Sequence, residues 1–272
     1  MESRAVTPLL AADRVALFGG IYSNDLALAR AVESAREHGA EALFCLGDLG
    51  AFGPHPDRVF PILRENSVRT LRGNYDDSIA KGLDDCQCGY TDPRDNRFAR
   101  LSYRYTFART SPENRRSLAA LPSEIRFELG GKRVLLSHGS PRRINEFLWE
   151  STTPLHFLEK LCDDHEADAL FVTHTGIKWK CRLPSGRIFA NVGVLGRPEN
   201  DGTARVWYAL LKAEGDHALD VEFVPVEYDH ARLAREMRNE NLPEEFVETI
   251  ETGWWTTCLE ILPAKERQRG RF

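Results

Sequence analysis

The 272-residue sequence contains no apolar run long enough to cross a membrane as a helix. Its opening segment, MESRAVTPLLAADR, lacks the charged and then apolar pattern of a secretory signal. Six cysteines are too few for a fold built on disulfides. The net charge of −5 gives no basic excess for the phosphates of a nucleic-acid polymer. We therefore expect a cytoplasmic protein with no membrane or nucleic-acid partner; a local basic pocket for a small anionic substrate remains compatible with this charge.

Short apolar runs alternate with amphipathic stretches, which is typical of layered α/β proteins. Strands are predicted at 15–18, 42–46, 68–71, 125–129, 133–137, 169–172, 179–183, 187–191, 204–211 and 221–226. Helices are predicted at 24–37, 56–65, 111–121, 154–165, 230–239 and 244–252. No linker or internal repeat interrupts this order, so we expect a single domain over residues 1–272 and leave the oligomeric state open.

Two segments are less regular. From about residue 77 to 109, Gly, Asp, Pro and two cysteines break the pattern, and we interpret this segment as an ordered excursion over the sheet edge. Within it, Tyr103 and Tyr105 alternate as they would on a strand face. From about residue 229 to 272, two helices lead into a Trp-rich tail, which we expect to cover the core or to form an interface.

Polar side chains follow four of the predicted strands at the points where these strands end. They are Asp48, Asn74, His138 and His174. Active sites of open α/β sheets gather at the carboxyl ends of strands, so we expect these four side chains to converge. A carboxylate, an amide oxygen and two imidazoles suit Mn, Fe or Zn. The sequence therefore predicts a site for one divalent metal ion, with a second ion left open.

The blocks around these four residues resemble those of the calcineurin-like metallophosphoesterases. The matching blocks are Gly47-Asp48 with Phe52-Gly53-Pro54, Gly73-Asn74-Tyr75-Asp76, His138-Gly139-Ser140-Pro141, Thr173-His174-Thr175-Gly176, and the loop from Asn191 to Pro198. They occur in family order and cover roughly residues 13 to 250. The resemblance implies an α/β fold, a two-sheet β-sandwich flanked by helices, and a metal-dependent hydrolase of phosphoester or nucleotide-type substrates.

Members of that family normally bind two metal ions. The resemblance implies that Asp48 bridges the two ions and that the other three residues complete one of the sites. The second site has lost its own ligands, because Gly20 and Tyr22 stand where the family has an Asp and a His, and Gly176 stands for a further His. This selective loss indicates a remodelled, mononuclear site beside an emptied space.

Three further residues are candidates for catalysis. Tyr75 replaces the family's catalytic histidine, and a tyrosine there can hydrogen-bond a phosphoryl oxygen, although its ordinary pKa near ~10 makes it a weak acid. Tyr22 lies in the remodelled block. Arg197 follows the last family block, and a guanidinium group suits bidentate contacts with phosphate.

Cys86 and Cys88 follow the second block closely enough in sequence to fold over the site. Residues at i and i+2 of an extended strand share one side, so both sulfurs could face the emptied space as metal ligands. A thiolate pair would shift the preference toward softer metals. The alternative is a pair of partly buried thiols or a local structural pair.

Three functions follow from these features, in order of preference. The first is a phosphoester or nucleotide hydrolase with one metal ion. The second is a specialised metalloenzyme, for example an iron enzyme, in which Cys86 and Cys88 rebuild the emptied side and the substrate is not a phosphoester. The third is a non-catalytic module that binds an anion or a metal ion.

Overall fold

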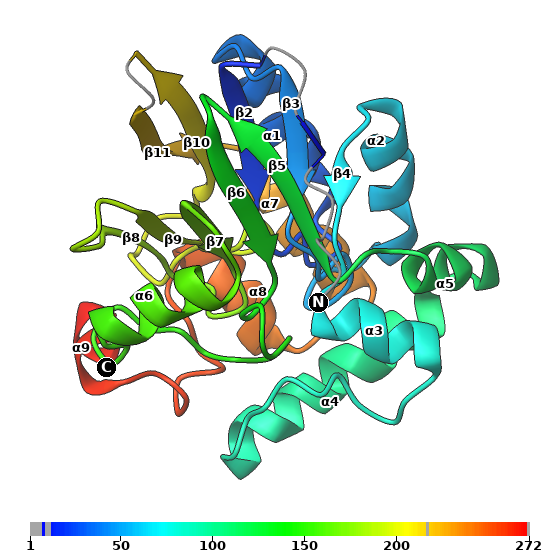
Figure 1. The fold of residues 1–272 in the computed structure, drawn as a ribbon. Coiled ribbons are helices and arrows are strands. Elements are labelled where there is room, and N and C mark those ends of the chain that lie inside the picture. The colour runs from blue at the N-terminus through cyan, green and yellow to red at the C-terminus, as the bar shows by residue number, and fades with distance from the viewer. Residues whose placement is uncertain (1–6, 9–11, 216–217, 271–272) are drawn as a thin grey trace.

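The computed structural model describes residues 7–8, 12–215 and 218–270, and these form two stacked β-sheets with helices on both outer sides (Figure 1). One sheet has the strand order β1 (Thr7–Pro8), β5 (Glu124–Leu129), β6 (Lys132–Ser137), β7 (Ala169–Val172), β9 (Ile188–Val192), β8 (Lys178–Arg182). The other has the order β11 (Ala218–Val226), β10 (Val206–Glu214), β2 (Arg14–Phe18), β3 (Ala42–Cys45), β4 (Arg69–Thr70). This arrangement is the two-sheet sandwich that the family resemblance implies.

The central strands are buried on both faces, which explains why they read as continuous apolar runs. In β2, Leu17 packs between the sheets whereas Phe18 faces the helical layer. Across the interface between the sheets, Phe44 of β3 stacks on Phe127 of β5 with ring centroids 4.7 Å apart. Neighbouring side chains therefore belong to different layers of the core.

Helices cover both outer faces. The five-stranded sheet packs against α1 (Asp25–Glu37), α2 (Val59–Glu65), α7 (His230–Asn239) and α8 (Glu244–Thr252), and the six-stranded sheet packs against α6 (Leu155–Asp164). A 3-10 turn (Pro56–Arg58) precedes α2, and α9 (Ala264–Arg269) lies in the tail, where no helix was predicted. The helices α1, α2, α6, α7 and α8 match the predicted segments closely.

The segment from 77 to 109 is mostly helical, and these helices were not predicted. It contains the end of α3 (Asn74–Lys81) and all of α4 (Pro93–Arg109), which Figure 1 shows beside α5 (Pro112–Ala119), to one side of the sheets. Asp92 starts α4 by accepting hydrogen bonds from the first free N–H groups, and Pro93 fits the first turn.

Tyr103 and Tyr105 therefore lie on a helix, and the predicted strand face was wrong. The buried positions of α4 recur at helical spacing; they are Asp95, Phe98, Ala99, Ser102, Tyr103 and Thr106. The i, i+2 spacing of the two tyrosines therefore does not indicate a strand, because the buried residues around them follow the helical period.

Among the residues that the structure describes, every helix is too short or too polar to span a bilayer. Residues 1–6 and 9–11, which carry most of the segment examined for a signal sequence, lie outside the described residues. The expectation about that segment stays a prediction.

The carboxyl ends of both sheets meet at one edge of the sandwich. β2, β3 and β4 run parallel in one sheet, and β6, β7 and β9 run parallel in the other. A parallel bridge between Gly20 and Val194 ties the loops that follow β2 and β9. The loops that leave these strands therefore surround one common space.

Candidate metal centre

Four side chains from four different loops converge at this edge. Asp48 follows β3, Asn74 begins α3, His138 follows β6 and His174 follows β7, and all four are buried. His138 Nε2 lies 3.0 Å from Asn74 Oδ1, 3.3 Å from Asp48 Oδ2 and 3.2 Å from His174 Nδ1. The structure thus brings together the four residues that the sequence singles out.

The hydrogen bonds behind these atoms show which of them carry protons. His138 Nδ1 lies 2.6 Å from the Leu46 carbonyl oxygen, and His174 Nε2 lies 3.2 Å from the Cys88 carbonyl oxygen. Each of these nitrogens must donate, so in the neutral rings the nitrogens that face each other carry lone pairs. Asn74 Nδ2 likewise donates to the Cys86 carbonyl oxygen at 2.8 Å, which turns Oδ1 toward His138.

Four acceptor atoms therefore face one another in a space from which water is largely excluded. Ligand atoms of Asp48, His138 and His174 lie within 4.8 Å of one another, and Asn74 Oδ1 lies beside them. A divalent cation would satisfy all four, and the mixture of oxygen and nitrogen donors suits Mn, Fe or Zn. The residues present fit the metal that the sequence predicts.

The charges at this cluster are strongly coupled. Burial opposes ionisation of Asp48, but His138, His174 and the Tyr75 N–H together hold the pKa of the carboxyl below its ordinary value. For His138, burial likewise opposes the charge, but Asp48, the Leu46 carbonyl and Asp76 together raise the pKa. Burial, followed by the charge on His138, lowers the pKa of His174 to about 3. His174 is therefore a neutral ligand at ordinary pH.

The backbone beneath the cluster is held in unusual conformations. Asp48 and His174 have φ values of 55° and 71°, in the left-handed region that non-glycine residues seldom adopt. Tyr22, Ala51 and Phe52 in the adjoining loops also have positive φ. Strained residues persist only where their surroundings fix them, and such residues tend to cluster at functional sites.

Asp76 fixes the loop that carries Asp48. Its carboxylate accepts hydrogen bonds from the backbone N–H groups of Asp48 at 2.7 Å, Leu49 at 3.0 Å and Gly73 at 2.8 Å. Burial, and then the Asp48 carboxylate, raise the pKa of Asp76 to about 6. Asp76 lies within a block that the sequence analysis identifies, but no role was predicted for it. The feature that could have indicated one is its position as an acidic residue in the first turn of a helix.

The space of the lost ligands is partly filled. A Cβ atom on Gly20 would lie 2.6 Å from a ring carbon of Tyr22. A Cβ atom on Gly176 would lie 3.0 Å from the Trp255 ring and 3.3 Å from the Arg197 guanidinium. The expectation of an emptied chamber is therefore corrected in part, because aromatic and guanidinium groups occupy much of it and leave a small cavity.

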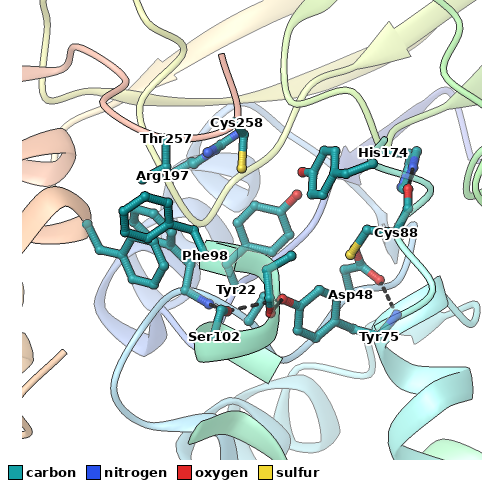
Figure 2. Close-up of a pocket in the computed structure, with 15 residues that line it drawn as sticks. Tyr22, Asp48, Tyr75, Cys88, Phe98, Ser102, His174, Arg197, Thr257 and Cys258 are labelled. Carbon is teal, nitrogen blue, oxygen red and sulfur yellow. Dashed lines mark hydrogen bonds between the residues drawn. The ribbon is translucent and has the colours of Figure 1, made fainter. Parts of the chain in front are cut away.

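A cavity of about 40 Å³ remains beside the cluster (Figure 2). Asp48 and His174 line one part of it, Arg197 lies at the other, and Tyr22 stands between them. The remaining walls are mostly apolar or aromatic, and they consist of Ala51, Phe52, Tyr75, Cys88, Tyr90, Phe98, Ala99, Ser102, Phe246, Thr257 and Cys258. Sequence reasoning missed the contributions of α4, α8 and the tail.

Tyr75 lines this cavity, and its hydroxyl is engaged by α4. The hydroxyl lies 3.1 Å from Ser102 Oγ and 3.4 Å from the Ala99 carbonyl oxygen, and Figure 2 shows the first of these contacts. Its backbone N–H donates to Asp48 Oδ1 at 3.0 Å. Tyr75 therefore helps to orient Asp48 through its main chain.

Cys86 and Cys88 lie at the site, but their sulfurs are bonded to each other in a disulfide. In this oxidised form neither sulfur is a thiolate ligand, which contradicts the predicted ligand pair. The pair reaches the cluster through its main chain instead, because its two carbonyl groups accept the hydrogen bonds from Asn74 and His174. A role as metal ligands in the reduced form stays a prediction.

We expect the Cys86→Ser variant to bind Mn²⁺ roughly 10-fold more weakly than the native oxidised protein, because loss of the disulfide frees the loop that orients two ligands. Calorimetric titration with Mn²⁺ measures this effect, and Cys181→Ser, a free cysteine away from the cluster, is the matched control. Unchanged affinity would contradict the positioning role. Thiolate ligands would instead be supported if reduction by a phosphine tightens Mn²⁺ binding to the native protein and the Cys88→Ser variant does not show this gain.

The fold and the ligand cluster define a protein of the metallophosphoesterase class. The model of the calcineurin-like phosphoesterase superfamily domain matches residues 15–216, and the chain belongs to this superfamily. An uncharacterized protein of Methanocaldococcus jannaschii is 26% identical over 248 residues, covering 85% of this chain and 94% of that protein.

Solved structures agree with this assignment. A hypothetical protein from Pyrococcus horikoshii OT3 has a TM-score of 0.74 and 25% identity, covering 89% of this chain and 99% of that chain. A metallophosphoesterase from Sphaerobacter thermophilus has a TM-score of 0.65 and 25% identity over the same shares of the two chains. The family relationship supports metal-dependent phosphoester hydrolysis as the general class of activity.

Proposed function

We propose that this protein hydrolyses a small phosphoester with a single divalent metal ion held by Asp48, Asn74, His138 and His174. The observation that carries the proposal is the convergence of four acceptor atoms, each oriented by a hydrogen bond or charge contact behind it. The positions of the lost ligands at Gly20 and Gly176 are crowded by other side chains of this chain, which supports a mononuclear centre.

A divalent ion bound there supplies Lewis acidity toward a phosphoryl oxygen and toward water. The residues of this chain orient the metal ligands. The Leu46 and Cys88 carbonyl groups fix the two imidazole rings, and the Tyr75 N–H fixes one oxygen of Asp48. Apolar walls exclude bulk water and thereby strengthen the charges inside the cavity.

Tyr22 acts as a hydrogen-bond donor in this proposal, whereas the Tyr75 hydroxyl already donates to α4. Burial raises the pKa of both Tyr22 and Tyr75 above the ordinary value, so each keeps its proton at neutral pH. Neither is then an effective acid for the leaving group. Hydrolysis should therefore favour esters whose leaving group is already a weak base, such as aryl phosphates.

The test is hydrolysis of p-nitrophenyl phosphate by protein stripped with a chelator and then reloaded with Mn²⁺, Fe²⁺ or Zn²⁺. We expect no turnover in the stripped protein, recovery with at least one metal, and binding of about one ion per chain. Phenyl phosphate, with its poorer leaving group, should react much more slowly. Turnover that persists without metal, or a stoichiometry of two, contradicts the mononuclear proposal.

The competing candidate is a binding module without catalysis. It predicts that metal and phosphate raise the melting temperature while no ester is cleaved with any of these ions. The same reloaded samples decide between the two functions.

A further inference from the structure

Arg197 is a buried cation whose partners are incomplete. Its side chain is 5% exposed, and the guanidinium carbon lies 3.7 Å from the centroid of the Trp255 ring. Its Nε atom is buried without a hydrogen-bond partner. The aromatic face stabilises the charge, yet it leaves the Nε–H group without an acceptor.

No carboxylate forms an ion pair with Arg197 within residues 12–215 and 218–270. An isolated buried charge is costly, and in proteins such groups are normally paired with an opposite charge. Other arginines of this chain show that pattern, for example Arg133, whose guanidinium contacts Asp168. The guanidinium of Arg197 is therefore suited to an anion that is not part of the described chain.

The position of Arg197 relates this anion to the metal centre. Arg197 lines the same cavity as Asp48 and His174, and one of its terminal nitrogens lies 3.3 Å from where a Cβ on Gly176 would be. A fixed positive charge thus stands where a ligand for a second ion has been lost. Tyr22, between the two ends, can donate a hydrogen bond to the same anion.

The size of the cavity limits the anion. A single water requires roughly 10–15 Å³ of such space. The cavity of about 40 Å³ therefore has space for about three waters, close to the size of one tetrahedral oxyanion. A terminal phosphoryl group meets this limit, whereas a phosphodiester carries a second organic arm on the same phosphorus.

We propose that Arg197, supported by Trp255, binds the terminal phosphoryl group of a phosphomonoester and supplies the positive charge of a missing second ion. The proposed binding of the anion depends only on Arg197 and the cavity, and not on the proposed hydrolase activity. Only the preference for monoester over diester cleavage rests on the function proposed above.

The experiment measures binding of inorganic phosphate to metal-loaded protein by calorimetry. We expect Arg197→Met to weaken phosphate binding roughly 30-fold or more, and Arg197→Lys to weaken it less, because lysine keeps the charge but loses the fork. Arg205→Met is the matched control, since Arg205 also lies over a tryptophan ring, Trp207, but is exposed and outside the cavity. Metal content and melting temperature confirm that each variant is folded.

The outcomes separate the two proposals. Equal phosphate affinity in Arg197→Met and Arg205→Met overturns the anion site, whatever the catalytic result. If Arg197→Met does not fold, Arg197→Lys is compared with Arg205→Met instead. Weakened phosphate binding without turnover of any ester supports the anion site and refutes the hydrolase. In active protein, faster cleavage of bis(p-nitrophenyl) phosphate than of p-nitrophenyl phosphate overturns the monoester preference.

Discussion

The His138→Ala variant is expected to lose the bound metal ion and to hydrolyse phosphoesters about a thousandfold more slowly than the native protein, since metal assistance provides several kcal/mol of transition-state stabilisation. His138 is the centre of the cluster, because its Nε2 atom is within 3.3 Å of atoms of Asn74, Asp48 and His174. Removing it leaves the three other acceptors without their common neighbour.

Two measurements check this expectation. Elemental analysis of protein purified without added metal gives the metal content, and initial rates with p-nitrophenyl phosphate give the activity. His156→Ala is the matched control, because His156 lies exposed on α6, outside the cavity. His174→Ala should resemble His138→Ala. Native metal content and native rate in both variants would show that the cluster is not the metal centre.

The strand-end residues could be predicted because each depends on its own local pattern. An apolar run followed by glycine, serine or threonine and then a ligand-type residue marks the end of a buried strand, and parallel strands bring such residues to one edge. Asp48, Asn74, His138 and His174 meet for this reason, although they come from loops far apart in the chain.

The contents of the neighbouring space could not be predicted in the same way. Sequence blocks show which ligands are missing at Gly20 and Gly176, but not which side chains take their volume. Trp255 reaches Gly176 from a tail 79 positions later in the chain, and such a contact depends on tertiary packing. The interpretation of the tail as a cover for the core is compatible with this position of Trp255. The contact between Trp255 and Arg197 was not predicted.

The cysteine pair shows a related difficulty. Spacing placed Cys86 and Cys88 near the site but did not distinguish two thiolate ligands from a disulfide. The hydrogen bonds from Asn74 and His174 to the carbonyl groups of this pair do not depend on the identity of the cysteine side chains. No sequence pattern therefore predicts them. The helical period of α4 was visible in principle, but the glycine and proline residues before it hid its start.

Asp76→Ala is expected to lower the free energy of unfolding of the metal-free protein by about 3 kcal/mol or more, since each buried N–H left without an acceptor costs about 1–3 kcal/mol. The carboxylate accepts three such bonds, from Asp48, Leu49 and Gly73. Because one of these residues is a ligand in a left-handed conformation, Mn²⁺ affinity should fall together with stability.

Urea denaturation with a chelator present measures the stability, and calorimetric titration with Mn²⁺ measures the affinity. Asp76→Asn keeps one acceptor oxygen and should lie between the native protein and Asp76→Ala. Asp77→Ala is the neighbouring control, because Asp77 makes ion pairs with Lys81 and Arg72 near the surface, and such pairs contribute only about 0–1 kcal/mol. If Asp76→Ala and Asp77→Ala are equally stable and bind Mn²⁺ equally well, the carboxylate of Asp76 does not hold the loop of Asp48 in place.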